Sequence, residues 1–266
     1  SWFGRTFISK KKKQALQLVT VQARIRLAIE ELGPTFIKFG QILADRPDLI
    51  SEPLRKELKK LQSSAEPLDD DRAINLIEHE LGHNISDIFL EFNRKHIASA
   101  SIGQAYKGKL KNGEEVIVKI QRPRIEQKIK LDLFILKFLA ERVAKSYPEL
   151  AAIDVVGVVG EFGNTIIKEL NYLNEAGNQI RFYEIFKNDP RVKIPKVYSE
   201  FTTRKILVME FIDGIEPDRI EDLEKAGCDP KIVAEWGADL ILKMIMVHGF
   251  FHGDPHPGNI FVLRNN

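Results

Sequence analysis

The segment that most constrains the fold lies near the end of the sequence. Residues 252–259 read His-Gly-Asp-Pro-His-Pro-Gly-Asn, with an apolar helical pattern before them at 230–248 and an apolar run after them at 260–263. Proline lacks an amide hydrogen and glycine is conformationally permissive, so the segment cannot continue as a regular helix or strand. The sequence therefore predicts a stiff loop between a buried helix and a strand, with Asp254 and Asn259 on that loop.

The spacing of Asp254 and Asn259 is that of the catalytic loop of protein kinases. In that loop the aspartate orients or deprotonates the attacking group, and the asparagine amide oxygen binds Mg²⁺. Two other interpretations fit the same residues. His252, Asp254 and His256 could form a transition-metal site, although no further soft ligand is nearby. A turn carrying solvated polar residues would need no chemistry at all. We favour phosphate transfer.

The periodicity of apolar residues predicts helices, then a small sheet, then more helices. Helical spacing covers the first part of the chain, at 18–32, 36–43, 54–61 and 73–81. Short extended runs at 104–110 and 115–120 are joined by Lys111-Asn112-Gly113, and Asn-Gly is a strong hairpin signal. Beyond them the predicted elements are helices at 125–145, 155–186 and 230–248 and strands at 197–199, 206–211 and 260–263. The fold class predicted is α+β.

Two further segments could bind phosphate groups, and a third could supply a carboxylate partner for the lysine of the first. Lys119 stands in a β-branched strand, where a kinase lysine pairs with the α and β phosphates, and a downstream helix carries Glu169 and Glu175 as carboxylate partners. Taken alone, Lys119, Glu169 and Glu175 would each be interpreted as an exposed surface charge. Small residues occupy the position of a kinase glycine-rich loop, where backbone amides and serine hydroxyls can meet phosphate oxygens. They are Ala98, Ser99, Ala100, Ser101, Ile102 and Gly103.

The last segment lies in the N-terminal helices and reads Lys38-Phe39-Gly40-Gln41. A glycine inside a helix costs about 1 kcal/mol relative to alanine, so Gly40 indicates close packing or a functional approach. Together with the small-residue loop, residues 169–178 and the string at 252–259, this segment resembles the signatures of the UbiB family of atypical kinases. The resemblance extends from about Gly33 to the last residue.

The resemblance implies a protein-kinase-like fold in three parts. Residues 1–85 would be a helical extension, 86–212 a small lobe with an antiparallel sheet and inserted helices, and 213–266 the start of a helical lobe. The family's Lys-x-Gly-Gln motif, here with Lys38 and Gln41, is thought to fill the space where other kinases bind a peptide. Lys38 would contact Glu169, the first residue of the family's Glu-x-Asp motif.

The resemblance also implies the roles of the remaining site residues. Lys119 would pair with Glu175 and contact the nucleotide phosphates beneath the loop at 98–103. Asp254 would be the catalytic aspartate, and Asn259 would bind Mg²⁺. The hinge that holds adenine through backbone hydrogen bonds would consist of Glu210, Phe211 and Ile212.

Two departures from the family pattern stand out. Asn171 occupies the third position of the Glu-x-Asp motif, so a second carboxylate beside Glu169 is absent. The family also has an Asp-Phe-Gly motif beyond the strand expected at 260–263, whereas the sequence ends at Asn266. We therefore expect a fragment or a truncated form, without the main Mg²⁺-binding aspartate and possessing only the start of the helical lobe.

The resemblance implies an ATPase or phosphotransferase with ATP and Mg²⁺ as cofactors, acting in coenzyme Q or related isoprenoid-lipid metabolism. Expected partners are a quinone-precursor lipid, a membrane surface and lipid-biosynthesis proteins, at the cytoplasmic membrane of a prokaryote or the mitochondrial inner membrane of a eukaryote. A net charge of +2 is too small for nucleic-acid binding. The alternative function is a non-catalytic pseudokinase module that binds nucleotide or a partner.

Overall fold

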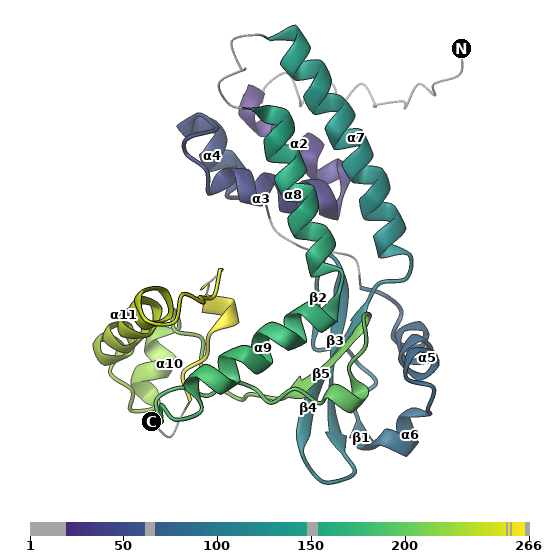
Figure 1. The fold of residues 1–266 in the computed structure, drawn as a ribbon, viewed down its shortest axis with the longest axis vertical. Coiled ribbons are helices and arrows are strands. Elements are labelled where there is room, and N and C mark those ends of the chain that lie inside the picture. The colour runs from purple at the N-terminus through teal and green to yellow at the C-terminus, as the bar shows by residue number, and fades with distance from the viewer. Residues whose placement is uncertain (1–19, 62–66, 148–153, 254, 256, 264–266) are drawn as a thin grey trace. The chain divides into compact units, whose positions relative to one another are not determined.

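The computed structural model describes the 266-residue chain except for residues 1–19, 62–66, 148–153, 254, 256 and 264–266 (Figure 1). Asp254 and His256, two residues of the predicted catalytic loop, lie outside the described residues. The chain divides into two compact units. The first comprises Ser1–Glu80, Arg94–Tyr106 and Lys119–Asn171, and the second comprises Leu81–Asn93, Lys107–Val118 and Tyr172–Asn266.

The helices of the first unit begin and end at recognisable signals. The Oγ1 of Thr20 accepts a hydrogen bond from Ala23 N at 3.2 Å and caps the first of them. Gly33, with a φ of +103°, separates that helix from the next, which begins at Pro34. The helices that lie wholly in this unit are α2 (Val21–Leu32), α3 (Pro34–Ala44), α4 (Glu52–Leu58), α7 (Ile125–Ser146) and α8 (Val155–Glu169). A further helix, α5 (Asp70–Leu81), ends at the unit boundary.

Two hydrophobic clusters hold these helices together. The larger one joins α3, α7 and α8 through buried residues that include Phe36, Ile129 and Phe162. The smaller one joins α3 and α4, with Leu58 and Leu61 almost fully buried against Ile37. Because α3 contributes to both clusters, the helix that carries Lys38 is fixed on two sides.

The sheet follows the predicted hairpin. Its strands are β1 (Phe89–Phe92), β2 (Ala98–Ser99), β3 (Gly103–Leu110), β4 (Glu115–Gln121) and β5 (Ile206–Glu210), in the order β1-β3-β4-β5 with β2 also paired to β3. Gly113, with a φ of +89°, makes the turn between β3 and β4. Val116, Val118 and Ile120 alternate into the core, so the intervening residues of β4 point to the other face. The predicted α+β class and hairpin are confirmed.

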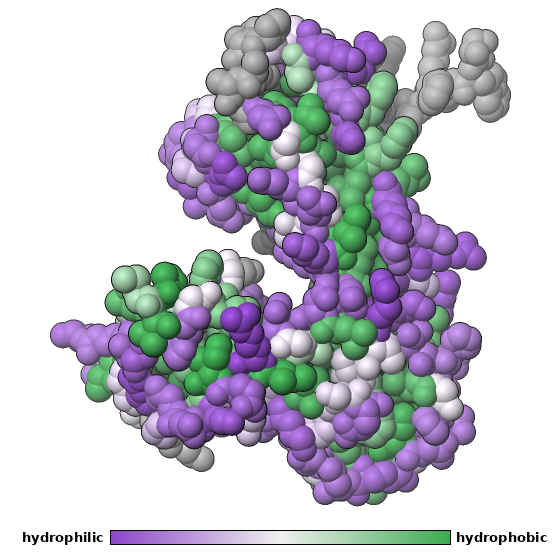
Figure 2. All heavy atoms as spheres, in the orientation of Figure 1, coloured by the Kyte–Doolittle hydropathy of each residue, from purple (hydrophilic) through white to green (hydrophobic). Residues whose placement is uncertain are grey.

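In the second unit, α9 (Tyr172–Phe186), α10 (Ile220–Lys225) and α11 (Pro230–Met246) are the main helices. The short helices α6 (Ile85–Ile88), η2 (Ser199–Phe201) and η3 (Pro257–Asn259) complete it. The prediction that 230–248 is a buried helix is wrong in its burial, since no residue of α11 is buried. Figure 2 shows apolar patches over this helix, where Leu242 and Met246 are 60% and 78% exposed. In the described part of this unit, too few elements pack against α11 to cover it.

Three further expectations differ from the structure. The helix expected at 155–186 is interrupted at Leu170 and Asn171, because the Nε2 of Gln121 donates to Leu170 O at 2.6 Å and takes up a helix carbonyl. The strand expected at 197–199 is a single bridge from Val197 to Met209, because the hydroxyl of Thr202 bonds both Tyr198 O and Val208 N in place of ladder partners.

The strand expected at 260–263 is likewise a single bridge, between Val262 and Ile215. Pro217 lacks the amide hydrogen that the next pair of such a ladder would need.

Candidate active site

The side chain of Lys38 meets Glu169 in the first unit. Lys38 stands on α3 and Glu169 is the last residue of α8, and Lys38 Nζ lies 3.6 Å from Glu169 Oε1. The two side chains are 35% and 38% exposed, so the ion pair is screened by water. The structure thus brings together the two residues that the sequence predicted to meet. Their role in catalysis stays a prediction.

Gln41 and Gly40, the other two residues of the Lys-x-Gly-Gln motif, contact neighbouring segments. The Nε2 of Gln41 donates to Leu61 O at 3.1 Å. A Cβ added at Gly40 would lie 2.5 Å from the Cδ1 of Leu61 and 3.4 Å from Ile29. Glycine is therefore favoured here because α3 packs closely against Leu61 and against Ile29 of α2, so that a Cβ would require the Leu61 side chain to shift.

The small-residue loop at 98–103 is a tight connection between β2 and β3. Ala98 pairs with Ala105 and Ser99 with Gln104, and Ala100 N donates to Gly103 O at 2.8 Å. Lys119 follows on β4, the strand next to β3, and its half-buried side chain is on the opposite face from the core residues Val118 and Ile120. The loop and the lysine therefore belong to neighbouring strands of one sheet.

The predicted pairing of Lys119 with Glu175 stays a prediction. Lys119 belongs to the first unit, whereas Glu175 stands in the first turn of α9 in the second unit.

Aromatic contacts connect α9 to the start of the predicted catalytic loop, within the second unit. The ring centroid of Phe182 lies 4.6 Å from that of Phe250 and 6.4 Å from that of His252. The guanidinium carbon of Arg181 lies 4.0 Å from the centroid of Phe250. The helix that carries Glu175 therefore supports the residues that lead into the loop.

The loop itself is described only in part. Asn259 ends the short helix η3, and its amide oxygen is a hard donor of the kind Mg²⁺ prefers. Asp254 and His256 lie outside the described residues. Among the described residues, no three or more His, Cys, Asp or Glu side chains gather as a metal cluster. The transition-metal alternative, which needs Asp254 and His256, is therefore not tested.

At the predicted hinge, part of the backbone is already hydrogen-bonded. Glu210 N donates to Lys196 O at 2.8 Å and Phe211 N donates to Glu115 O at 3.0 Å. The ammonium of Lys107 lies 3.8 Å from the centroid of the Phe211 ring and 3.2 Å from Glu115 Oε1. An adenine would therefore have to use the carbonyl oxygens of this segment or the N–H of Ile212.

A partly buried polar network that the sequence did not predict joins the start of α5 to β3. The Oδ1 of Asp70 accepts hydrogen bonds from Tyr106 Oη at 2.8 Å and from Gln104 Nε2 at 3.1 Å, and lies 2.9 Å from His96 Nδ1. Burial raises the pKa of Asp70, but the hydrogen bonds from His96 and Tyr106 outweigh it and leave the pKa below its usual value. Burial and Asp70 raise the pKa of Tyr106. The network anchors the N-terminus of α5 to β3.

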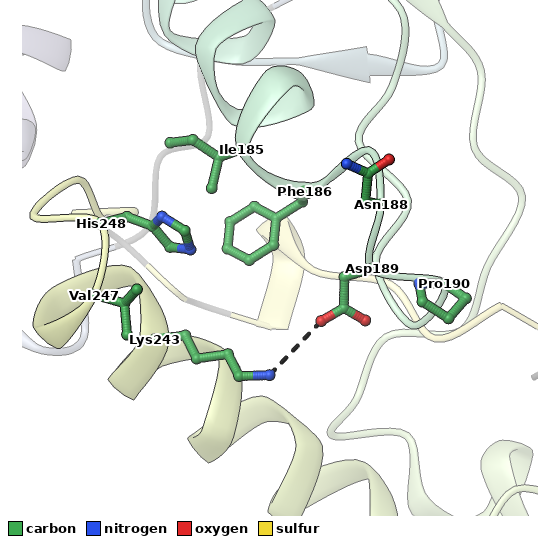
Figure 3. Close-up of a pocket in the computed structure, with 8 residues that line it drawn as sticks. All are labelled: Ile185, Phe186, Asn188, Asp189, Pro190, Lys243, Val247 and His248. Carbon is green, nitrogen blue, oxygen red and sulfur yellow. Dashed lines mark ion pairs between the residues drawn. The ribbon is translucent and has the colours of Figure 1, made fainter.

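An open pocket of about 500 Å³ lies between the end of α9 and α11 in the second unit (Figure 3). Asp189, on its wall, lies 3.8 Å from Lys243 Nζ, and Arg191 donates to it at 2.7 Å. The hydrogen bonds from Arg191 lower the pKa of Asp189 to about 2. None of the predicted site residues lines this pocket, so we assign it no part in the site.

Comparisons with known proteins identify relatives of this chain. A family model described as the ABC1 atypical kinase-like domain matches residues 60–266. A relative named probable protein kinase UbiB, from Pseudomonas aeruginosa, is 42% identical over 247 residues, which are 92% of this chain and 46% of that protein. The protein of the same name from Marinobacter nauticus is 40% identical over 243 residues, 91% of this chain and 44% of that protein. This chain spans less than half the length of these relatives.

A solved structure is similar over most of the chain. It is the complex of Rv3197 with erythromycin from Mycobacterium tuberculosis, with a TM-score of 0.63 and 30% sequence identity. The match covers 96% of this chain and 64% of that one.

Proposed function

This chain belongs to the ABC1 atypical kinase-like family, and from that premise we propose that it is the nucleotide-binding part of a UbiB-type ATPase or phosphotransferase. The proposed reaction is the binding of Mg-ATP followed by hydrolysis or phosphoryl transfer, in support of isoprenoid-quinone metabolism at a membrane. The observation that carries the proposal is the sheet: the small-residue loop at 98–103 leads from β2 into β3, and Lys119 stands on β4, the neighbour of β3.

The residues would contribute mainly electrostatically. The ammonium of Lys119, held extended by Glu175, would offset phosphate charge, and Asp254 would orient the attacking hydroxyl or water. Bound Mg²⁺ supplies a divalent charge that neutralises the phosphate oxygens, and the amide oxygen of Asn259 suits it as a ligand. The loop at 98–103 would bind phosphate oxygens through backbone amides.

The helical extension would act through the Lys38–Glu169 ion pair, which connects α3 to the end of α8. We propose that residues 1–85 form this extension, 86–212 the small lobe and 213–266 the start of the helical lobe. No described helix has both the length and the apolar composition to cross a bilayer. Contact with a membrane and with a quinone-precursor lipid is therefore proposed from the family alone.

Nucleotide binding and turnover can be tested separately. Calorimetric titration of the chain with Mg-ATP should show binding that is weakened at least tenfold by Lys119→Met. The matched control is Lys137→Met, which removes an exposed lysine of the same unit on α7 and should leave binding unchanged.

Phosphate release then separates the two functions considered. Release should fall at least tenfold in Asp254→Asn, while ATP binding is retained. Because the sequence lacks the Asp-Phe-Gly motif of the family, release is measured in a chain extended through that motif, and binding without release there would favour the non-catalytic module instead. Absence of nucleotide binding by the wild type would overturn the enzymatic function and would leave only the partner-binding form of the alternative.

A further inference from the structure

We propose that Arg122 is a positioning residue that clamps the small-residue loop at 98–103, so that the loop offers more amide hydrogens than carbonyl oxygens to a phosphate. Arg122 follows directly after the end of β4, three residues beyond Lys119. The phosphate-binding role of this clamp depends on the proposed nucleotide binding. The contacts that form the clamp all lie within the first unit.

Arg122 holds the loop at three points, Ser99, Ala100 and Ile102. Its Nη2 donates to the Oγ of Ser99 at 2.8 Å, and its Nε donates to Ala100 O at 3.0 Å. Its backbone N–H donates to Ile102 O at 2.9 Å. A planar guanidinium presents its donors in a fixed fork, so two of these contacts also fix the direction of the loop.

Within the described residues, these bonds leave the turn at 100–103 with one carbonyl oxygen that has no donor, that of Ser101, against two N–H groups without an acceptor. The carbonyl oxygens of Ala100 and Ile102 accept from Arg122, and that of Gly103 accepts from Ala100 N. In the described part of the chain, the N–H groups of Ser101 and Ile102 have no hydrogen-bond acceptor. A run of backbone N–H groups binds anions, whereas exposed carbonyl oxygens repel them. The arrangement therefore suits a phosphate.

The charge of Arg122 adds to this preference. Its side chain is partly buried and bonds neutral oxygens of the loop, and burial lowers the pKa of the guanidinium below its usual value. A guanidinium stays protonated at any physiological pH. The guanidinium of Arg122 thus places a permanent positive charge against the loop. Five of the six loop residues are not glycine, so the loop backbone has less conformational freedom than that of a glycine-rich loop.

The clamp also connects the loop to Lys119. Both Arg122 and Lys119 extend from the same strand end, and Arg122 O accepts from Ile125 N at 3.3 Å at the start of α7. The loop, the lysine strand and α7 therefore share one anchoring residue. Removing its side chain should loosen the loop without removing the lysine.

The test measures loop mobility and nucleotide affinity in the chain with Arg122→Met, with Arg142→Met on the exposed face of α7 as the matched control. Amide hydrogen exchange in the peptide covering 98–103 should be at least tenfold faster in Arg122→Met and unchanged in Arg142→Met. Calorimetry should show ATP affinity reduced roughly tenfold, the factor that corresponds to the loss of one such hydrogen bond. Adenosine affinity should not change, because adenosine carries no phosphate.

Arg122→Lys supplies the second variant. Lysine keeps the positive charge and one donor nitrogen, so this variant should recover part of the ATP affinity. If Arg122→Met does not fold, the same measurements are made on Arg122→Lys. Exchange of the loop equal to that of the control would overturn the clamp, as would equal losses of ATP and adenosine affinity. A wild-type chain that binds neither ligand, with exchange still faster in Arg122→Met, would overturn the proposed function and the phosphate role while retaining the anchoring.

Discussion

Replacement of Thr35 by valine should uncouple α3 from α7 at a single buried hydrogen bond. Thr35 is 2% exposed and Asp132 is 8% exposed, and Thr35 Oγ1 donates to Asp132 Oδ2 at 2.6 Å across 97 residues of sequence. The neighbouring Phe36 is buried in the cluster that joins α3, α7 and α8. The bond therefore lies at the contact that holds the Lys38 helix in place.

The magnitude follows from what valine keeps and what it removes. Valine has almost the volume of threonine, so no cavity forms, but the buried carboxylate loses a charge-assisted hydrogen bond. Such a bond contributes about 1.5–3 kcal/mol. We expect a loss of about 2 kcal/mol in the free energy of unfolding, and a fall in Tm of roughly 4–8 °C for a chain of this size.

Urea and thermal unfolding measure this loss, with Thr165→Val as the matched control. The hydroxyl of Thr165 is exposed and donates only to Glu161 O within α8, so its removal should cost less than about 0.5 kcal/mol. Thr35→Val should also cost less in an Asp132→Asn background, because the bond then involves no charge. A loss in Thr35→Val no larger than in Thr165→Val would refute the reasoning.

Three further predictions concern packing, function and pH. Gly40→Ala should destabilise the chain by about 1 kcal/mol in urea unfolding, because overpacking against Leu61 exceeds the helix-propensity gain; Gly160→Ala, with open space around it, should instead stabilise. Lys38→Met should change stability by less than about 0.5 kcal/mol, since its ion pair is screened, yet alter phosphate release severalfold; an equal loss of folded protein and activity would contradict this. Hydrogen bonds from Arg191 lower the pKa of Asp189 to about 2. The ionised carboxylate should therefore stabilise the fold above about pH 4, by about 1 kcal/mol after screening. This contribution to the free energy of unfolding should disappear as the pH falls toward 2. Urea unfolding between pH 2 and 6 should show that Asp189→Asn lacks this component.

Local signals predicted the elements that local chemistry determines. The hairpin at Gly113 and the start of α3 at Pro34 follow from turn and cap residues that act within a few positions. The break at Asn171 could not be predicted in this way, because Gln121, far away in sequence, takes up the carbonyl of Leu170.

In the candidate site, too, contacts between residues far apart in sequence could not be predicted from local patterns. Contact of Lys38 with Glu169 was predicted through resemblance to a family, since nothing in the spacing of two residues so far apart indicates that they meet. Asp70, Gln104 and Tyr106 were missed because each looks like an ordinary helix-start or strand residue, and only the fold assembles their network. Arg122 had no signal beyond its place between a strand and a proline.

The hydrogen bond from Gln121 to Leu170 has a consequence for how sequences of this kind can change in length. It closes the chain on itself at the two ends of the α7–α8 hairpin, since residues 122–169 depart from β4 and return beside it. Insertions at the far end of that excursion, between α7 and α8, should leave Lys119 and Glu169 where they are, provided that Gln121 keeps its partner and the helices keep their contacts with α3. Lengthening the hairpin should therefore be far better tolerated than shifting either end by one residue.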